Sequence, residues 1–151
     1  TSTLVTPLAQ NNGVVGDLMY THTLGSWIIN PYIQFSDIPS SPAIGIAHDA
    51  TSFAGAVLAN YAITQEFSVA GRVEYIATSG NAASGAPNLL YGPGSDAWSI
   101  TFTPTFQHGV FFARGEASYT GAIDSADGAV FGRSLDRTSQ ARLMLEAGVV
   151  F

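Results

Sequence analysis

The last twelve residues of the chain alternate strictly between two kinds of side chain. One face of this segment is apolar and consists of Ala141, Leu143, Leu145, Ala147, Val149 and Phe151. The other face consists of Gln140, Arg142, Met144, Glu146, Gly148 and Val150. Because successive side chains of a strand point to opposite faces, the pattern predicts a strand between two media. In a soluble β domain the charged face would meet water, whereas in an outer-membrane barrel the apolar face would meet lipid.

Composition narrows the class of protein. Only 11% of the 151 residues are charged and 46% are hydrophobic, whereas a typical soluble domain has roughly 25% charged residues. The net charge of -6 and the absence of Lys argue against nucleic-acid binding and a P-loop. No segment approaches the roughly 20 apolar residues of a spanning helix, so a membrane protein of this composition must be a closed barrel. We expect one domain over residues 1–151.

Strands of about ten residues recur along the chain. The alternating segments are Val14–His22, Ser26–Ser36, Phe53–Ile63, Glu66–Thr78, Ala97–Gln107, Val110–Thr120 and Gln140–Phe151. Thr3–Gln10 could supply an eighth strand. Pro31 and Pro104 lie on apolar faces within two of these strands, where proline removes a ladder donor, and a bulge could accommodate Pro31.

The connections between these strands alternate in length. Short turns fall at Leu24-Gly25, Thr64-Gln65 and His108-Gly109, and long loops rich in Gly, Pro and Ser span Asp37–Thr51, Ser79–Asp96 and Gly121–Ser139. Short turns at one end and long loops at the other are typical of a transmembrane β-barrel. The expected fold is therefore all-β: an antiparallel transmembrane barrel with about eight strands in this chain, short periplasmic turns and long extracellular loops.

Aromatic residues gather near the strand ends, as in the two interfacial girdles of a membrane barrel. The candidates are Tyr20, Trp27, Phe35, Tyr61, Phe67, Tyr75, Trp98, Phe106, Phe111 and Tyr119.

Charged residues recur on the polar faces of three strands. They are Arg72, Glu74, Arg114, Glu116, Arg142 and Glu146. Charges that face a lumen can line a water-filled eyelet or pair across strands as a plug. A packed network of ion pairs without any role in transport is the competing interpretation.

Signatures of catalysis or metal binding are missing from the sequence. It contains no GxSxG, HExxH or CxxC, so we expect neither an enzyme nor a cofactor. His22, His48 and His108 fall on a strand, a long loop and a tight turn, so we expect no shared metal site. Asp124–Gly128 lacks the alternating ligands of a calcium loop. Gly25-Ser26-Trp27 is similar to the G-x-W of lipocalins, so a soluble ligand-binding barrel remains an alternative.

Longer segments resemble the outer-membrane porin family called β-barrel porin-2. They are GDLMYTHTLGSWIINPYIQFS at Gly16–Ser36, AGRVEYIATSG at Ala70–Gly80, NLLYGPGSDAWSITFTPTFQ at Asn88–Gln107 and FFARGEASY at Phe111–Tyr119. The carboxy-terminal pattern of Leu145, Ala147, Val149 and Phe151 also resembles the assembly signal of bacterial outer-membrane barrels. The resemblance implies a Gram-negative outer-membrane protein without a cofactor, in contact with outer-membrane lipid, the barrel assembly machinery and small solutes, with a homo-oligomer left open.

Family members are usually more than twice as long as this chain, which also begins without Met. We therefore expect the C-terminal portion of a larger porin-like barrel that passes small solutes passively. The alternative is a small closed eight-stranded barrel with a structural or adhesive role, because eight strands leave an interior filled by side chains.

Overall fold

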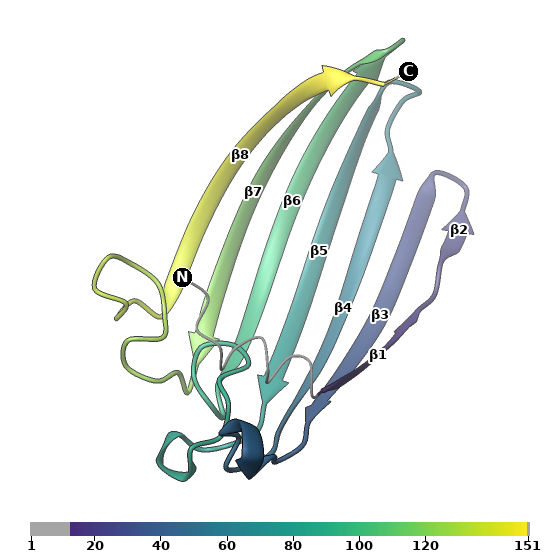
Figure 1. Cartoon of the computed structure of the whole chain (residues 1–151). Helices are drawn as coiled ribbons and strands as arrows, with labels where there is room; N and C mark the ends of the chain where they lie inside the picture. Colours follow the sequence, from purple (N-terminus) through teal and green to yellow (C-terminus); the bar gives the residue numbers. More distant parts are fainter. Residues whose placement is uncertain (1–12, 151) are drawn as a thin grey trace.

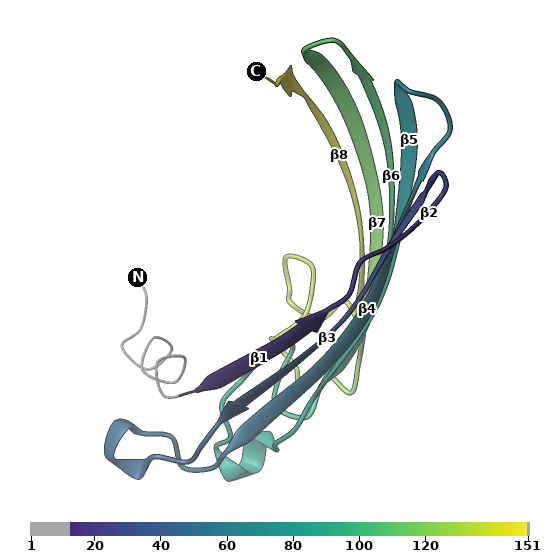
Figure 2. The same cartoon turned by 90° about the vertical axis from the view of Figure 1, so that its right-hand side faces the viewer.

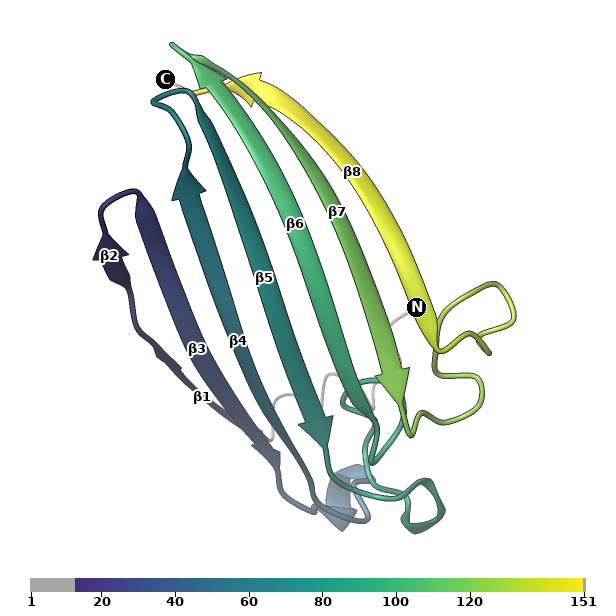
Figure 3. The ribbon, with the colours of Figure 1, turned by 180° about the vertical axis from the view of Figure 1, so that it is seen from behind.

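The computed structural model describes residues 13–150, which form one curved antiparallel sheet (Figure 1). Its strands are β1 (Val14–Met19), β2 (His22–Leu24), β3 (Trp27–Ile38), β4 (Ala50–Ala62), β5 (Phe67–Thr78), β6 (Asp96–His108), β7 (Phe111–Ile123) and β8 (Ser139–Val149). Two short 3-10 turns, η1 (Pro42–Ile44) and η2 (Ala82–Ser84), lie in the loops. The strand order is β1-β3-β4-β5-β6-β7-β8, with β2 also paired to β3 (Figure 3). The all-β antiparallel prediction is confirmed.

The two ends of the sheet differ as the sequence predicts. Short turns join β2 to β3, β4 to β5 and β6 to β7, whereas residues 39–49, 79–95 and 124–138 form long loops at the opposite end (Figure 1). The strands reach further toward these loops than the sequence pattern indicates. β3 and β4 still pair at Ile38 and Ala50, and β6 and β7 at Asp96 and Ile123. Cross-strand hydrogen bonds thus continue where the loop-like composition has already begun.

The first predicted strand, Val14–His22, is wrong as a single element, because it is interrupted between β1 and β2. Both pieces keep one register on β3, as Met19 opposite Tyr32 and His22 opposite Ile29 show. Between them the Tyr20 amide donates to the Pro31 carbonyl at 3.0 Å, but Pro31 has no N–H to return the bond. No bulge is needed to accommodate Pro31, since the register with β4 continues without a shift.

Pro104 has the same effect in the middle of the sheet. It pairs with Val69 of β5, while the ladder toward β7 is interrupted and resumes at Thr105 opposite Arg114. Each proline therefore turns its missing donor toward one neighbouring strand only, and the register on both sides is preserved.

The sheet curls like part of a barrel wall and is open (Figure 2). β1 lies at one edge and β8 at the other, and within residues 13–150 they do not pair with each other. The closed eight-stranded barrel is therefore not what this part of the chain forms. Thr3–Gln10, the candidate extra strand, and Phe151 lie outside the described residues. In the same range, no helix combines the length and the apolarity needed to cross a bilayer.

The two faces of the sheet have the reverse of the arrangement in a soluble protein. In β6 the small polar residues Ser99 and Thr101 are only 8% and 7% exposed, whereas Ile100 and Phe102 are 51% and 54% exposed. Side chains on the concave side of a curved sheet converge and shield one another. We therefore assign the polar face to the concave side, toward which the long loops also bend in Figure 2.

Candidate lumen surface

All six charged candidates from the sequence lie on the polar face. The register connects them to the buried hydroxyls, since Arg72 is opposite Thr101 and Glu74 is opposite Ser99. Across β6 and β7, Thr101 pairs with Ser118, which in turn pairs with Arg142. The concave surface thus carries three arginines and three glutamates over β5, β7 and β8.

Each arginine on this surface has a glutamate partner. Arg72 Nε lies 3.3 Å from Glu74 Oε2 within β5, and Arg142 Nη2 lies 3.7 Å from Glu116 Oε1 between β8 and β7. The third ion pair joins Arg114 to Glu146. All six side chains are between about one third and three fifths exposed. Exposed pairs of this kind contribute little stability, typically about 0–1 kcal/mol. Because the side chains are exposed, their charges remain accessible to solvent and solutes.

The sequence did not indicate that a tyrosine joins this charged surface. Tyr32 of β3 pairs with Ala56 of β4, and Ala56 pairs with Glu74 of β5. Tyr32 and Glu74 therefore lie on the same face of the sheet, with only the small Ala56 side chain between them. The position of Tyr32 could have been found from one signal in the sequence. A large residue lies on the polar face two strands away from a charged residue, and the residue between them is small.

The aromatic candidates form two rows on the opposite, apolar face. In each of five strands an aromatic pair is separated by eight positions: Trp27 and Phe35, Phe53 and Tyr61, Phe67 and Tyr75, Trp98 and Phe106, and Phe111 and Tyr119. Eight residues span about 26 Å along the strand, and the tilt of about 35–45° in membrane barrels reduces this to about 18–21 Å along the barrel axis, somewhat less than the apolar band of about 25 Å. Ring contacts within the rows include Trp27 with Tyr61 at 4.7 Å and Trp98 with Tyr119 at 5.5 Å between centroids.

The rows also reveal the tilt of the strands. In the row near the short turns, Trp27 is directly opposite Tyr61, and Phe67 is directly opposite Phe106. The other two steps are staggered: Phe67 lies two residues from Val69, the partner of Tyr61, and Phe111 lies two residues from Ala113, the partner of Phe106. Four residues of stagger over four strand spacings correspond to a tilt of about 35°, within the range of membrane barrels. Tyr20 is not in either row, since it lies opposite Pro31, midway between Trp27 and Phe35.

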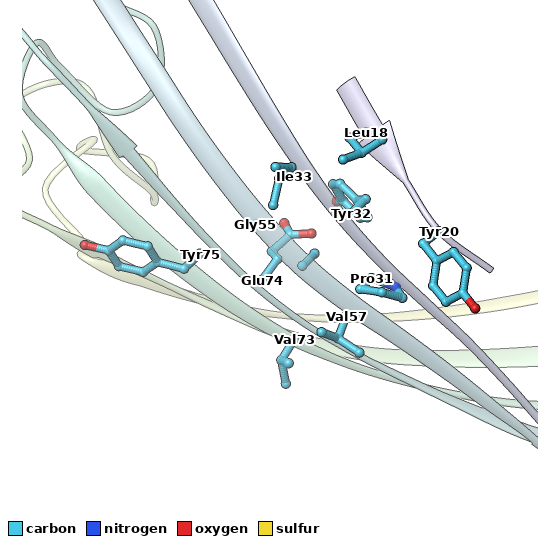
Figure 4. Close-up of a pocket in the computed structure, with 11 residues that line it drawn as sticks. Leu18, Tyr20, Pro31, Tyr32, Ile33, Gly55, Val57, Val73, Glu74 and Tyr75 are labelled. Carbon is cyan, nitrogen blue, oxygen red and sulfur yellow. The ribbon is translucent and has the colours of Figure 1, made fainter. Parts of the chain in front are cut away.

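The same apolar face has a shallow groove beside β1 (Figure 4). It encloses about 600 Å³ and exists because Gly55 has no side chain between Ile33 and Tyr75. Its other apolar lining residues are Leu18, Tyr20, Pro31, Val57 and Val73. Figure 4 shows Tyr20 and Tyr75 at opposite ends of the groove.

The long loops pack against one another at the end of the sheet. Ile46 of loop 39–49 packs with Ile38, Ile44 and Leu89. The Ala126 amide of loop 124–138 donates to the Tyr91 carbonyl at 2.9 Å, and the rings of Tyr91 and Phe131 meet edge to face at 4.8 Å. Burial and the negative charge of Glu74 raise the pKa of Tyr91 above its ordinary value. We call this surface, which includes Ile46, Leu89, Tyr91, Ala126 and Phe131, the loop cap.

The remaining sequence candidates are dispersed. Leu145, Ala147 and Val149 share the apolar face of β8, with Leu145 93% exposed, and Phe151 is outside the described range. His22 is in β2, His48 is in loop 39–49, and His108 contacts the Glu66 carboxylate at the short-turn end. Among residues 13–150, no three His, Cys, Asp or Glu side chains are close enough to hold a metal ion.

Comparison with known proteins gives one match. The family model described as "Putative beta-barrel porin-2, OmpL-like" matches residues 1–151. No curated protein and no solved structure shows significant similarity to the chain. The match agrees with the antiparallel sheet, its sorted loops and its apolar outer face. The chain belongs to this family of outer-membrane β-barrel porins.

Proposed function

We propose that this chain is part of a bacterial outer-membrane barrel of the Gram-negative type that lets small solutes diffuse passively through a polar lumen. One observation carries the proposal: a curved sheet exposes apolar residues on one face and places six charges and buried hydroxyls on the other. Such a wall is suited to separating lipid from water. On this hypothesis Arg72, Glu74, Arg114, Glu116, Arg142 and Glu146 face the lumen.

The open edges support a barrel larger than the described sheet. The backbone groups along β1 and β8 need hydrogen-bond partners, because lipid supplies none. Additional strands would satisfy both edges and would also widen the barrel beyond the eight strands that fill their own interior. We therefore propose that residues 1–151 form one domain that is the C-terminal part of a longer barrel.

The proposed partners follow from the two faces. Outer-membrane lipid would cover the apolar face, including the groove over Gly55, and small solutes would pass along the charged face. Leu145, Ala147, Val149 and Phe151 would be read by the barrel assembly machinery. We propose a channel and not an enzyme, with no nucleic-acid partner, and leave a homo-oligomer as an outcome to be measured.

Planar bilayers test the proposal directly. The source protein, extracted from membranes in detergent, should show heat-modifiable migration, a mass above the 15.8 kDa of this chain, and ohmic conductance after reconstitution. Replacing only Glu74, Glu116 and Glu146 by glutamines should shift ion selectivity toward anions, replacing only Arg72, Arg114 and Arg142 should shift it toward cations, and both variants should preserve heat-modifiability. Unchanged selectivity would remove these residues from the conducting path, and no conductance from a folded protein would refute the pore.

The loop cap favours one second candidate, a structural or adhesive barrel without a pore. Three long loops that pack together could present a binding surface outside the cell. Full-length protein that folds but does not conduct would support this candidate. The soluble lipocalin-like alternative conflicts with the family match and with the exposed apolar face.

A further inference from the structure

A small cavity with both apolar and polar lining residues lies on the concave face, between two of the charged strands. It encloses about 170 Å³ and is lined by Leu58, Ala70, Gly71, Arg72, Thr101, Thr103 and Glu116. We call it the threonine slot. Thr101 and Thr103 come from β6, and the flanking β5 and β7 supply Arg72 and Glu116. A guanidinium thus stands on one side of two hydroxyls and a carboxylate stands on the other.

The hydroxyl of Thr101 is an unusual feature of this slot. Thr101 is only 7% exposed, and its Oγ1 has no hydrogen-bond partner within the part of the chain that is described. The Ser99 Oγ, two positions away in β6, is also buried without a partner, whereas the Arg72 Nε has the Glu74 Oε2 atom at 3.3 Å. A buried polar group without a partner costs about 1–3 kcal/mol, so the unpartnered Thr101 hydroxyl in the wall of the cavity indicates that something polar belongs there.

The chemistry of the slot selects the class of occupant. Arg72 can only donate hydrogen bonds, Glu116 can only accept them, and the two threonine hydroxyls can do both. Both charges are already accompanied, Arg72 by Glu74 at 3.3 Å and Glu116 by Arg142 at 3.7 Å. A free ion of either sign would therefore meet a repelling charge as well as an attracting one. A neutral solute with adjacent hydroxyls can donate to the carboxylate and accept from the guanidinium at once.

We propose that the threonine slot is a binding site for the hydroxyl groups of a small neutral polyol, such as one sugar ring, moving along the lumen. Leu58 and Ala70 supply an apolar wall for the C–H groups of such a solute. The Arg72 side chain is 42% exposed, so it can move toward the solute without disturbing the strand. The inference rests on the proposed function, because a solute reaches the slot only if the polar face lines water.

Ligand binding, measured apart from conduction, tests this inference. Full-length protein in detergent micelles is titrated with glucose and followed by saturation-transfer NMR. The Thr101→Val, Thr103→Val double variant removes both slot hydroxyls at nearly constant shape, and it should fold because one of them is buried without a partner. We expect glucose to bind about tenfold more weakly to it. Thr105→Val is the matched control, on the same face of β6 but outside the slot.

The outcomes separate this inference from the proposed function. Glucose binding that weakens only in the double variant supports the slot, whether or not the protein conducts. Equal binding to all three proteins, absence of glucose binding, or tighter binding of glycine than of glucose would overturn it, the last by favouring a zwitterion. A protein that binds glucose at the slot but carries no current would refute the pore alone. Heat-modifiable migration confirms that each variant is folded.

Discussion

Arg114 of β7 lies directly opposite Glu146 of β8, and its Nε and Nη2 both donate hydrogen bonds to one carboxylate oxygen, Glu146 Oε2. The next pair is diagonal, since Arg142 of β8 reaches back to Glu116 of β7. Each strand therefore supplies one cation and one anion to its neighbour. The two strands neutralise each other, and removal of any one of these four charges leaves its partner uncompensated on the polar face.

The first prediction concerns ion selectivity. Glu146→Gln leaves the Arg114 charge unpaired, so we expect the reversal potential in a salt gradient to shift toward anions, whereas Arg114→Gln should shift it toward cations. The double variant should return close to the wild type, because its net charge is the same. The effect should shrink at high salt, where the Debye length falls to about 3 Å at 1 M. A double variant that behaves like either single one would show that the pair does not act as a unit.

Stability should respond much less than selectivity to the same changes. Both side chains are about half exposed, so we expect a coupling energy under about 1 kcal/mol in a double-mutant cycle of urea unfolding.

A second prediction concerns Gly121, which lies opposite Trp98 at the loop end of the apolar face. A Cβ at this position would lie 2.7 Å from the Trp98 indole nitrogen. Gly121→Ala should therefore displace the ring from its contact with Tyr119 and destabilise the barrel by about 1–3 kcal/mol. Tryptophan fluorescence and unfolding in urea would measure both effects.

Gly71→Ala is the control for this substitution. Gly71 is on the same face of the sheet, but a Cβ added there would have only the Thr101 carbonyl oxygen within 4 Å, at 3.9 Å. It should leave the fluorescence unchanged. Similar behaviour of the two variants would contradict the close approach at Gly121.

Much of the fold could be predicted because a membrane barrel has a simple period. Apolar and polar residues alternate by two, as in Trp98, Ser99, Ile100 and Thr101, and this alone assigns each side chain to a face. The length of the connections then sorts the two ends of the sheet. Six charged residues were placed on one face for the same reason, although their role in a lumen remains a proposal.

Features that depend on cross-strand register could not be predicted in the same way. Arg114 has Glu116 two positions away in sequence but contacts Glu146, because the opposite strand presents that carboxylate directly. The break between β1 and β2 depends on which neighbour Pro31 faces, and sequence does not contain that information. The threonine slot likewise requires Arg72 and Glu116 to flank Thr101 across three strands.

A third prediction follows from the interruption at Pro31. Pro31→Ala would supply an N–H facing Tyr20, so the two residues could exchange both hydrogen bonds of their pair. We expect β1 and β2 to merge and their amides to gain protection from hydrogen exchange, with a stabilisation of about 0.5–1.5 kcal/mol. Pro104→Ala is the internal comparison, where protection should rise in β7 and not in β1 or β2. Unchanged exchange at residues 19–22 would show that another cause interrupts the edge strand.

The fourth prediction uses Tyr91 as a reporter of the loop cap. Burial and the Glu74 charge raise the pKa of Tyr91 above 10.0, so the folded protein favours the neutral phenol. The stabilisation is therefore fully present below about pH 10 and is lost as the pH rises through the higher folded pKa. Gly92→Ala should separate the loops, because Gly92 has a φ of 112° and an added Cβ would lie 2.5 Å from the Ala126 Cβ. Ultraviolet titration, with Tyr91→Phe as the difference reference, should show the Tyr91 pKa falling toward 10 in this variant.

Gly128→Ala is the control, since its φ is also positive but nothing lies within 4 Å of the added Cβ. A Tyr91 pKa that stays raised in Gly92→Ala would mean that the contact with loop 124–138 does not bury the ring.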